Sequence, residues 1–117
     1  MSELRYLAAA LIVFAAVFHS LLGEKKLITP MLAVRDEFIQ APMTQVITRF
    51  GWHASSGFFL LTALIIVLPD SPDTLIWATG CLWFALGIVN LIMARAKHPG
   101  GYLLSAVGVL ILTGQVV

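Results

Sequence analysis

Apolar residues fill four long stretches of this sequence, and polar or helix-breaking residues separate them. The stretches cover residues 6–22, 47–68, 74–94 and 101–117. A helix needs roughly 20 predominantly apolar residues to cross the hydrocarbon core of a bilayer. Backbone groups in hydrocarbon must be hydrogen-bonded internally, which favours helices over open strands. The pattern therefore predicts an all-α integral membrane protein, a four-helix bundle forming a single transmembrane domain over residues 1–117.

The connection between the first two stretches is the only long one. The pair Thr29-Pro30 favours a helix start, because proline is common at the first helical position. Beyond it, Met31, Val34 and Phe38 share one helical face, while several residues between them are polar. This amphipathic pattern predicts a short helix that lies in the membrane interface after the first span. An irregular loop is the alternative.

Small residues mark the faces through which the spans are expected to pack. Helices in lipid associate through small residues, because only close backbone approach gains contact energy there. In the first span the inward face is expected to carry Ala8, Ile12, Ala15, Ala16 and His19, and the lipid face Leu7, Leu11, Phe14, Phe18 and Leu21. The corresponding inward stripes of the other spans are Arg49, His53, Ser56, Gly57 and Leu60; Gly80, Trp83, Gly87, Asn90 and Ala94; and Gly101, Ser105, Gly108 and Gln115. A second small face, Gly51-xxx-Ser55, suggests that the second span has two packing partners.

Charge is sparse and unevenly distributed. Only 11% of the 117 residues are charged, and the net charge is +1. Six of the seven Lys and Arg residues lie on one side of the predicted membrane, in or next to the first and third connections, with Arg5 the exception. The positive-inside rule then places both termini in the periplasm of a bacterial inner membrane. With a net charge this small, no strongly basic surface for binding nucleic acid is expected. The four apolar stretches make the lipid bilayer the expected partner.

The polar residues of the spans converge on the predicted cytoplasmic side. The candidate ligand-binding residues are His19, Glu24, Arg49, His53, Asn90 and His98. Polar groups at membrane depth are costly when they lack a partner, so these side chains are expected to contact one another. They form the one predicted cluster that can carry chemistry.

Several interpretations of the cluster remain open. It could be a polar network that only fixes helix register. His19, His53, His98 and Glu24 are of the types that bind zinc or another first-row transition metal, although no two of them share a tight local motif. His19 and His53 could alternatively grip a haem from two helices. An anionic amphiphile could bind to Arg49 with Lys25 and Lys26.

Other chemistry is disfavoured. The single cysteine, Cys81, cannot form an intrachain disulfide, which excludes thiol–disulfide enzymes that need paired cysteines. No predicted span contains an acidic residue, which argues against proton-coupled cation export through a membrane-embedded carboxylate. The serines Ser20, Ser55 and Ser56 lack the flanking elbow or acid–base partners expected of a hydrolase.

Two short motifs resemble those of a known group of proteins. The motifs are His19-Ser20-Leu21-Leu22-Gly23-Glu24 and Arg49-Phe50-Gly51-Trp52-His53, with His98-Pro99-Gly100 before the last span. The chain resembles small bacterial inner-membrane proteins that have four spans and no assigned function. The resemblance covers most of the first two spans and implies the four-pass topology but no catalytic residue.

Two functional hypotheses follow from the sequence. The first is a self-associating protein or an accessory subunit of a membrane complex, because soluble loops are nearly absent and small faces are abundant. The second is a metal-, haem- or amphiphile-binding protein that uses the polar cluster, with enzyme activity left open.

Overall fold

The chain is almost entirely helical. A computed structural model describes residues 2–117, and this part of the chain contains no strand. The elements are α1 (Glu3–Gly23), the π-helical turn η1 (Glu24–Ile28), α2 (Thr29–Leu32), α3 (Glu37–Gln40), α4 (Pro42–Val67), α5 (Asp73–Met93) and α6 (Pro99–Val116). Because α1, η1 and α2 continue into one another, the first helix is 30 residues long. Four helices are long and apolar enough to span a membrane, which confirms the all-α prediction and the number of candidate spans.

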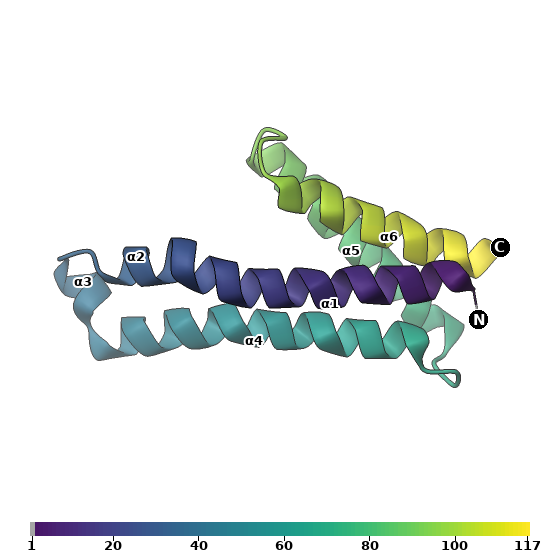
Figure 1. Ribbon diagram of the computed structural model, residues 1–117, viewed down its shortest axis with the longest axis horizontal. Helices are drawn as coiled ribbons and strands as arrows, with labels where there is room; N and C mark the ends of the chain where they lie inside the picture. The colour runs from purple at the N-terminus through teal and green to yellow at the C-terminus, as the bar shows by residue number, and fades with distance from the viewer. Residues whose placement is uncertain (1) are drawn as a thin grey trace.

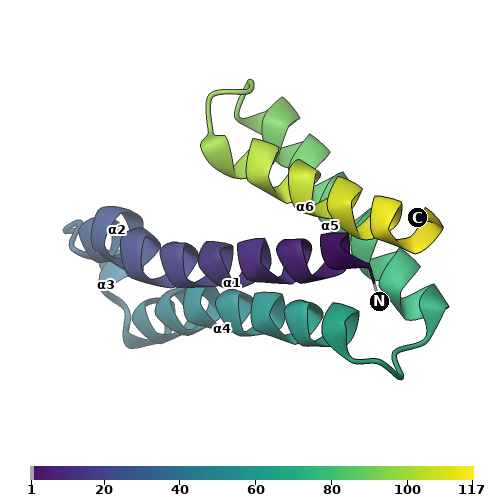
Figure 2. The same ribbon diagram turned by 45° about the vertical axis from the view of Figure 1, so that its right-hand side comes forward.

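The helices form two hairpins that meet at one end. Figures 1 and 2 show α1 running beside α4, and α5 beside α6. The hairpins converge near the two chain termini and diverge toward the connection between α5 and α6. The observed arrangement is therefore V-shaped, and packing of all four helices is concentrated in the half of the molecule near the termini.

That half contains the hydrophobic core. Every long helix contributes two buried residues to it: Ala8 and Ile12, Ala63 and Ile66, Ile76 and Trp83, Val107 and Ile111. The Trp83 indole Nε1 donates a hydrogen bond to Thr62 Oγ1 at 3.1 Å, which links α5 to α4. At the terminal end, Arg5 Nη1 donates to Gln115 Oε1 at 3.2 Å and so joins α1 to α6. Arg5, the cation at the other end of the first helix, is thus held by a polar partner.

Helices α5 and α6 approach closely through glycine. A Cβ atom built on Gly108 would lie 2.6 Å from Phe84 Cα, and one on Gly87 would lie 2.8 Å from Ser105 Cα. Both glycines and Trp83 are buried, as the predicted small-residue stripes required. The expected inward faces of α5 and α6 are thus confirmed at these positions.

The predicted small-residue face of the first helix is buried, but further along the helix a different set of positions turns inward. Ala8, Ile12, Ala15 and Ala16 are all buried. The π-helical turn then adds a residue to one turn, which rotates the following residues relative to a regular α-helix. Ile28 and Leu32 are consequently buried, whereas Met31, Val34 and Phe38, the predicted apolar face of the interfacial helix, are all exposed. An α-helical element does begin at Thr29, with Pro30 in its first turn, but it continues the first helix without a break.

A separate short helix does follow the first span. It is α3, and the Asp36 side chain caps its start by accepting hydrogen bonds from the backbone N–H groups of Phe38 and Ile39 at 3.0 and 3.1 Å. Gln40 and Gln45 both donate side-chain hydrogen bonds to the carbonyl of Leu32. These bonds satisfy a carbonyl that the end of a helix leaves without an intrahelical partner.

The predicted inward stripe of α4 needs one correction. Ser56 is buried as expected, but Gly57 and Leu60 face outward and are exposed. The buried side of the carboxyl-terminal half carries Ala63 and Ile66 instead. Gly57 and Leu60 lie about 100° and 40° around the helix from Ser56, in the direction away from Ala63 and Ile66.

Candidate functional site

A polar network lies in the seam between α1 and α4. At its centre, Ser20 Oγ lies 2.7 Å from Ser56 Oγ and 3.1 Å from His53 Nδ1. Ser56 is buried, while Ser20 and His53 are partly exposed. The hydroxyl of Ser20 therefore bridges a buried serine and an imidazole on the facing helix.

Charged residues continue the network at its outer end. Arg49 Nε donates to Glu24 Oε1 at 2.5 Å, and His53 Nε2 lies 3.6 Å from Glu24 Oε2. Among residues 2–117, Glu24 Oε2 has no hydrogen-bond partner, although this atom is buried. The side chains of Arg49, His53 and Glu24 are 43%, 39% and 30% exposed, so the outer end of the network is accessible. A partly exposed ion pair of this kind adds little to stability, about 0–1 kcal/mol.

A second group of contacts surrounds His19. Its Nε2 lies 2.8 Å from Ser55 Oγ, and its ring stacks on Trp52 with centroids 4.0 Å apart. Trp52 Nε1 also donates to the carbonyl of His19 at 2.8 Å. The indole lies over Gly23, where a Cβ atom would come within 2.5 Å of Trp52 Nε1. Glycine at this position thus allows the indole to lie against α1.

Sequence spacing explains how the network forms. Ser20 and Glu24 are four residues apart on one helix, and Arg49, His53 and Ser56 follow one another at spacings of four and three on the other. Residues at these spacings lie on one face of a helix. The π-helical turn begins at Glu24, and such turns occur frequently at functional sites.

The cluster predicted from the sequence is only partly assembled. The structure brings together His19, Glu24, Arg49 and His53, but Asn90 and His98 belong to the other hairpin, which diverges from this seam (Figure 1). His98 is exposed, and its Nδ1 accepts a hydrogen bond from the backbone N–H of Gly100 at 3.1 Å. It caps α6, and within residues 2–117 it forms no hydrogen bond or ion pair with the other candidates.

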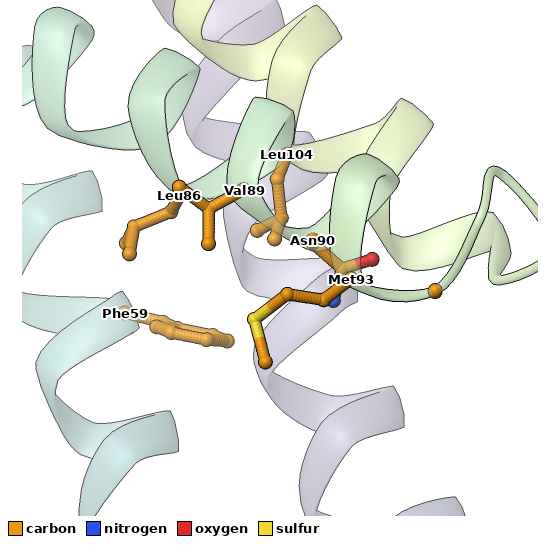
Figure 3. A pocket seen from close by; sticks show the side chains of 7 residues that line it. Phe59, Leu86, Val89, Asn90, Met93 and Leu104 are labelled. Atoms are coloured by element: carbon orange, nitrogen blue, oxygen red, sulfur yellow. The ribbon is translucent and has the colours of Figure 1, made fainter.

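Asn90 lines an apolar groove between the hairpins. Figure 3 shows its side chain beside those of Phe59, Leu86, Val89, Met93 and Leu104. The groove has a volume of about 500 Å³. Asn90 Oδ1 is buried, and within residues 2–117 it has no hydrogen-bond partner. Phe59 also contacts His19, with ring centroids 5.3 Å apart, so the groove borders the polar seam.

The geometry offers no site for a metal within the described part of the chain. There, no group of three or more His, Cys, Asp or Glu side chains is close enough to hold an ion. The nitrogen atoms His19 Nε2 and His53 Nδ1 already contact Ser55 and Ser20. Metal or haem binding by His19, His53, His98 and Glu24 therefore gains no support from the contacts.

Sequence reasoning missed four residues of the site. Ser20, Trp52, Ser55 and Ser56 all contribute hydrogen bonds to it. The expectation that Ser20 lacks an acid–base partner is wrong, because His53 Nδ1 lies within hydrogen-bonding distance. The signal was present in the spacing, since Ser20 lies four residues before Glu24 and Ser56 three residues after His53.

Comparison with known proteins gives no relative. No family model, no curated protein and no solved structure matches this chain.

Proposed function

We propose that this chain is a multi-pass protein of a bacterial inner membrane, with both termini periplasmic, that acts by associating with further copies of itself or with a larger membrane complex. The main support is the open arrangement of the helices. The hairpins diverge over the half of the molecule that contains Asn90, and the groove there is large and apolar. In lipid, such a surface is expected to be covered either by acyl chains or by another helix.

The outer face of α4 favours another helix. Gly51 and Gly57 are exposed, and a Cβ built on either meets no atom within 4 Å. They lie six residues apart, about 120° around the helix, with the half-buried Ala54 between them. Exposed small residues let a partner helix approach closely, and unused glycine in a helix interior is otherwise unfavourable by roughly 0.5–1 kcal/mol relative to alanine.

The unpaired Asn90 amide adds a second argument. A buried amide oxygen without a hydrogen bond is unfavourable, more so where water is scarce. The Asn90 Oδ1 atom is enclosed by its own chain beside Gly101, so a second chain can reach only the amide nitrogen. Acyl chains offer this N–H group no acceptor, whereas a polar side chain of a second chain does. Interhelical hydrogen bonds of this kind contribute about 0.6–2 kcal/mol in membranes.

Cysteine crosslinking in native membranes tests the proposal. In a Cys81→Ala background, Gly57→Cys is expected to form an oxidant-dependent homodimer or a crosslink to one partner of different mass. Val109→Cys, an exposed position on α6, serves as the matched control and is expected to remain monomeric. Light scattering of the wild-type protein should likewise give a mass larger than that of one chain. A strict monomer in mild detergent, combined with no crosslink at Gly57→Cys, would remove the basis of the proposal.

A second candidate function is binding of an anionic amphiphile. An apolar groove of about 270 Å³ on α1 is lined by Val17, Phe18, Leu21 and Leu22 and ends at Lys25. An acyl chain would fit the apolar part, and the exposed Lys25 ammonium would attract an anionic headgroup. Native mass spectrometry tests it: phosphatidylglycerol should be retained in preference to phosphatidylcholine, and Lys25→Gln should remove that preference.

A further inference from the structure

The hydroxyl of Ser20 has an unusual environment for a serine in a helix. Such hydroxyls commonly hydrogen-bond a carbonyl of the preceding turn. Ser55 and Ser105 do so in this chain, donating to the carbonyls of Trp52 and Gly101. Within residues 2–117, Ser20 Oγ instead contacts only Ser56 Oγ and His53 Nδ1 on the facing helix.

The groups beyond Ser20 occur in the order that nucleophilic catalysis requires. His53 presents one ring nitrogen to Ser20 and the other, at 3.6 Å, to Glu24 Oε2. Arg49 holds the other oxygen of the Glu24 carboxylate. A hydroxyl, an imidazole and a carboxylate in sequence are the parts of an activated serine, and such contacts are often long before substrate binds. This order recurs on unrelated folds, so it is recognised by geometry and not by sequence position.

We propose that Ser20 and His53 form a serine-type acyl-transfer site, with Glu24 as a positioning residue for the imidazole. A hydroxyl group can donate to one partner and accept from another. In the structure the Ser20 hydroxyl donates to Ser56. When this hydroxyl turns to His53 Nδ1, 3.1 Å away, it can accept from Ser56 instead, and the His53 tautomer that carries its proton on Nε2 presents that proton to Glu24. In this arrangement His53 is ready to accept the proton of Ser20.

The depth of the site indicates the class of substrate. Ser20 lies about 25 Å along the helix axis from Glu3, at ~1.5 Å per residue. In a hydrocarbon core about 30 Å thick that begins near Glu3, this position is close to the opposite boundary. Ester linkages of membrane amphiphiles lie at such a boundary, between acyl chains and headgroups. The substrate is therefore an acyl ester of an amphiphile, and water can reach the partly exposed His53 from the same side.

The reaction balances with water as the only co-reactant. Ser20 Oγ attacks the ester carbonyl while its proton passes to His53, and the resulting tetrahedral species expels the alcohol, which takes that proton. The acyl group is then bound to Ser20 Oγ. A water molecule, deprotonated by His53, attacks the acyl carbonyl, and the proton returns to Ser20 as the bond to its oxygen breaks. One ester and one water give one carboxylic acid and one alcohol.

A fluorophosphonate probe tests whether Ser20 is activated. The wild-type protein in lipid nanodiscs is expected to form one covalent adduct, which peptide mass spectrometry should locate at Ser20. Ser20→Ala should lose the adduct, whereas Ser105→Ala, at a serine bonded to its own helix, should label like the wild type. An acyl ester of p-nitrophenol should release p-nitrophenolate with the same dependence on the variants.

Variants of the partners separate catalysis from folding. His53→Ala is expected to slow labelling by about 10²–10⁴-fold, and added imidazole should restore part of the rate, which a merely structural role would not predict. Glu24→Gln, which removes the carboxylate, should slow labelling. Glu24→Asp, which keeps the carboxylate, should retain most of the wild-type rate. Absence of an adduct in the wild-type protein, an adduct at another residue, or a labelling rate indifferent to His53→Ala would overturn the proposal. None of these results depends on the oligomeric state, so association through α4 is tested separately.

Discussion

Replacement of Gly108 by alanine tests how closely α5 and α6 depend on contact between their backbones. The added Cβ would lie 2.6 Å from Phe84 Cα. Because the obstructing atoms include the backbone of α5, no side-chain rotation can relieve the overlap, and the helices must separate locally. Dispersion contacts along the hairpin weaken when helices move apart by even half an ångström.

The size of the effect follows from comparison with the same substitution elsewhere. Overpacking of a closely packed site is unfavourable by about 1–3 kcal/mol. Alanine also favours the helix over glycine by roughly 1 kcal/mol at either position. At Gly57 the new methyl group meets no atom of its own chain within 4 Å. The difference in unfolding free energy between Gly108→Ala and Gly57→Ala therefore measures the cost of the overlap between the added methyl group and α5.

Equilibrium unfolding in mixed micelles, followed by tryptophan fluorescence, measures this difference. The two variants should be compared at a dilution where the wild-type protein is monomeric, so that association through Gly57 does not contribute. The folding equilibrium constant of Gly108→Ala is expected to be about 5- to 150-fold below that of Gly57→Ala. Equal stability of the two variants would refute the close backbone contact between the helices.

Three further substitutions can be measured in the same unfolding assay. Ala96 has φ +57°, a left-handed conformation that disfavours alanine, so Ala96→Gly should stabilise the fold by about 1 kcal/mol; a loss of stability would contradict that conformation. Thr62→Val removes the acceptor of the Trp83 indole N–H and should cost about 1–3 kcal/mol, and a neutral result would show that the bond is dispensable. Trp52→Phe keeps an aromatic ring beside His19 but loses the hydrogen bond to its carbonyl, with an expected loss of about 0.5–1.5 kcal/mol; an unchanged midpoint would argue against that bond.

The number and type of the long helices could be predicted from the sequence, because apolar length alone decides which segments can cross a bilayer. Helix phase was harder to predict. Leu27 and Ile28 are both apolar, as are Met31 and Leu32, so hydrophobicity does not tell which of each pair is buried. The π-helical turn makes that choice, and no residue type in Glu24–Ile28 signals it.

The candidate site divides in a similar way. His19, Glu24, Arg49 and His53 were predicted together because they lie at similar depth on consecutive antiparallel helices, and they do share one seam. The same depth argument included His98, but depth does not determine lateral position. The angle between the hairpins separates His98 from the seam, and that angle depends on packing near the termini, which no local motif describes.

The way in which the hairpins are joined has a mechanical consequence. Their contacts are concentrated at the terminal end, where Arg5 bonds to Gln115. A rotation of one hairpin about this end would therefore displace its far end the most. Helix α6 has 18 residues and is about 27 Å long. A rotation of about 10° at the joined end would displace its far tip by about 5 Å, roughly the rise of one helical turn. A small change at the joined end would thereby alter the width of the groove beside Phe59.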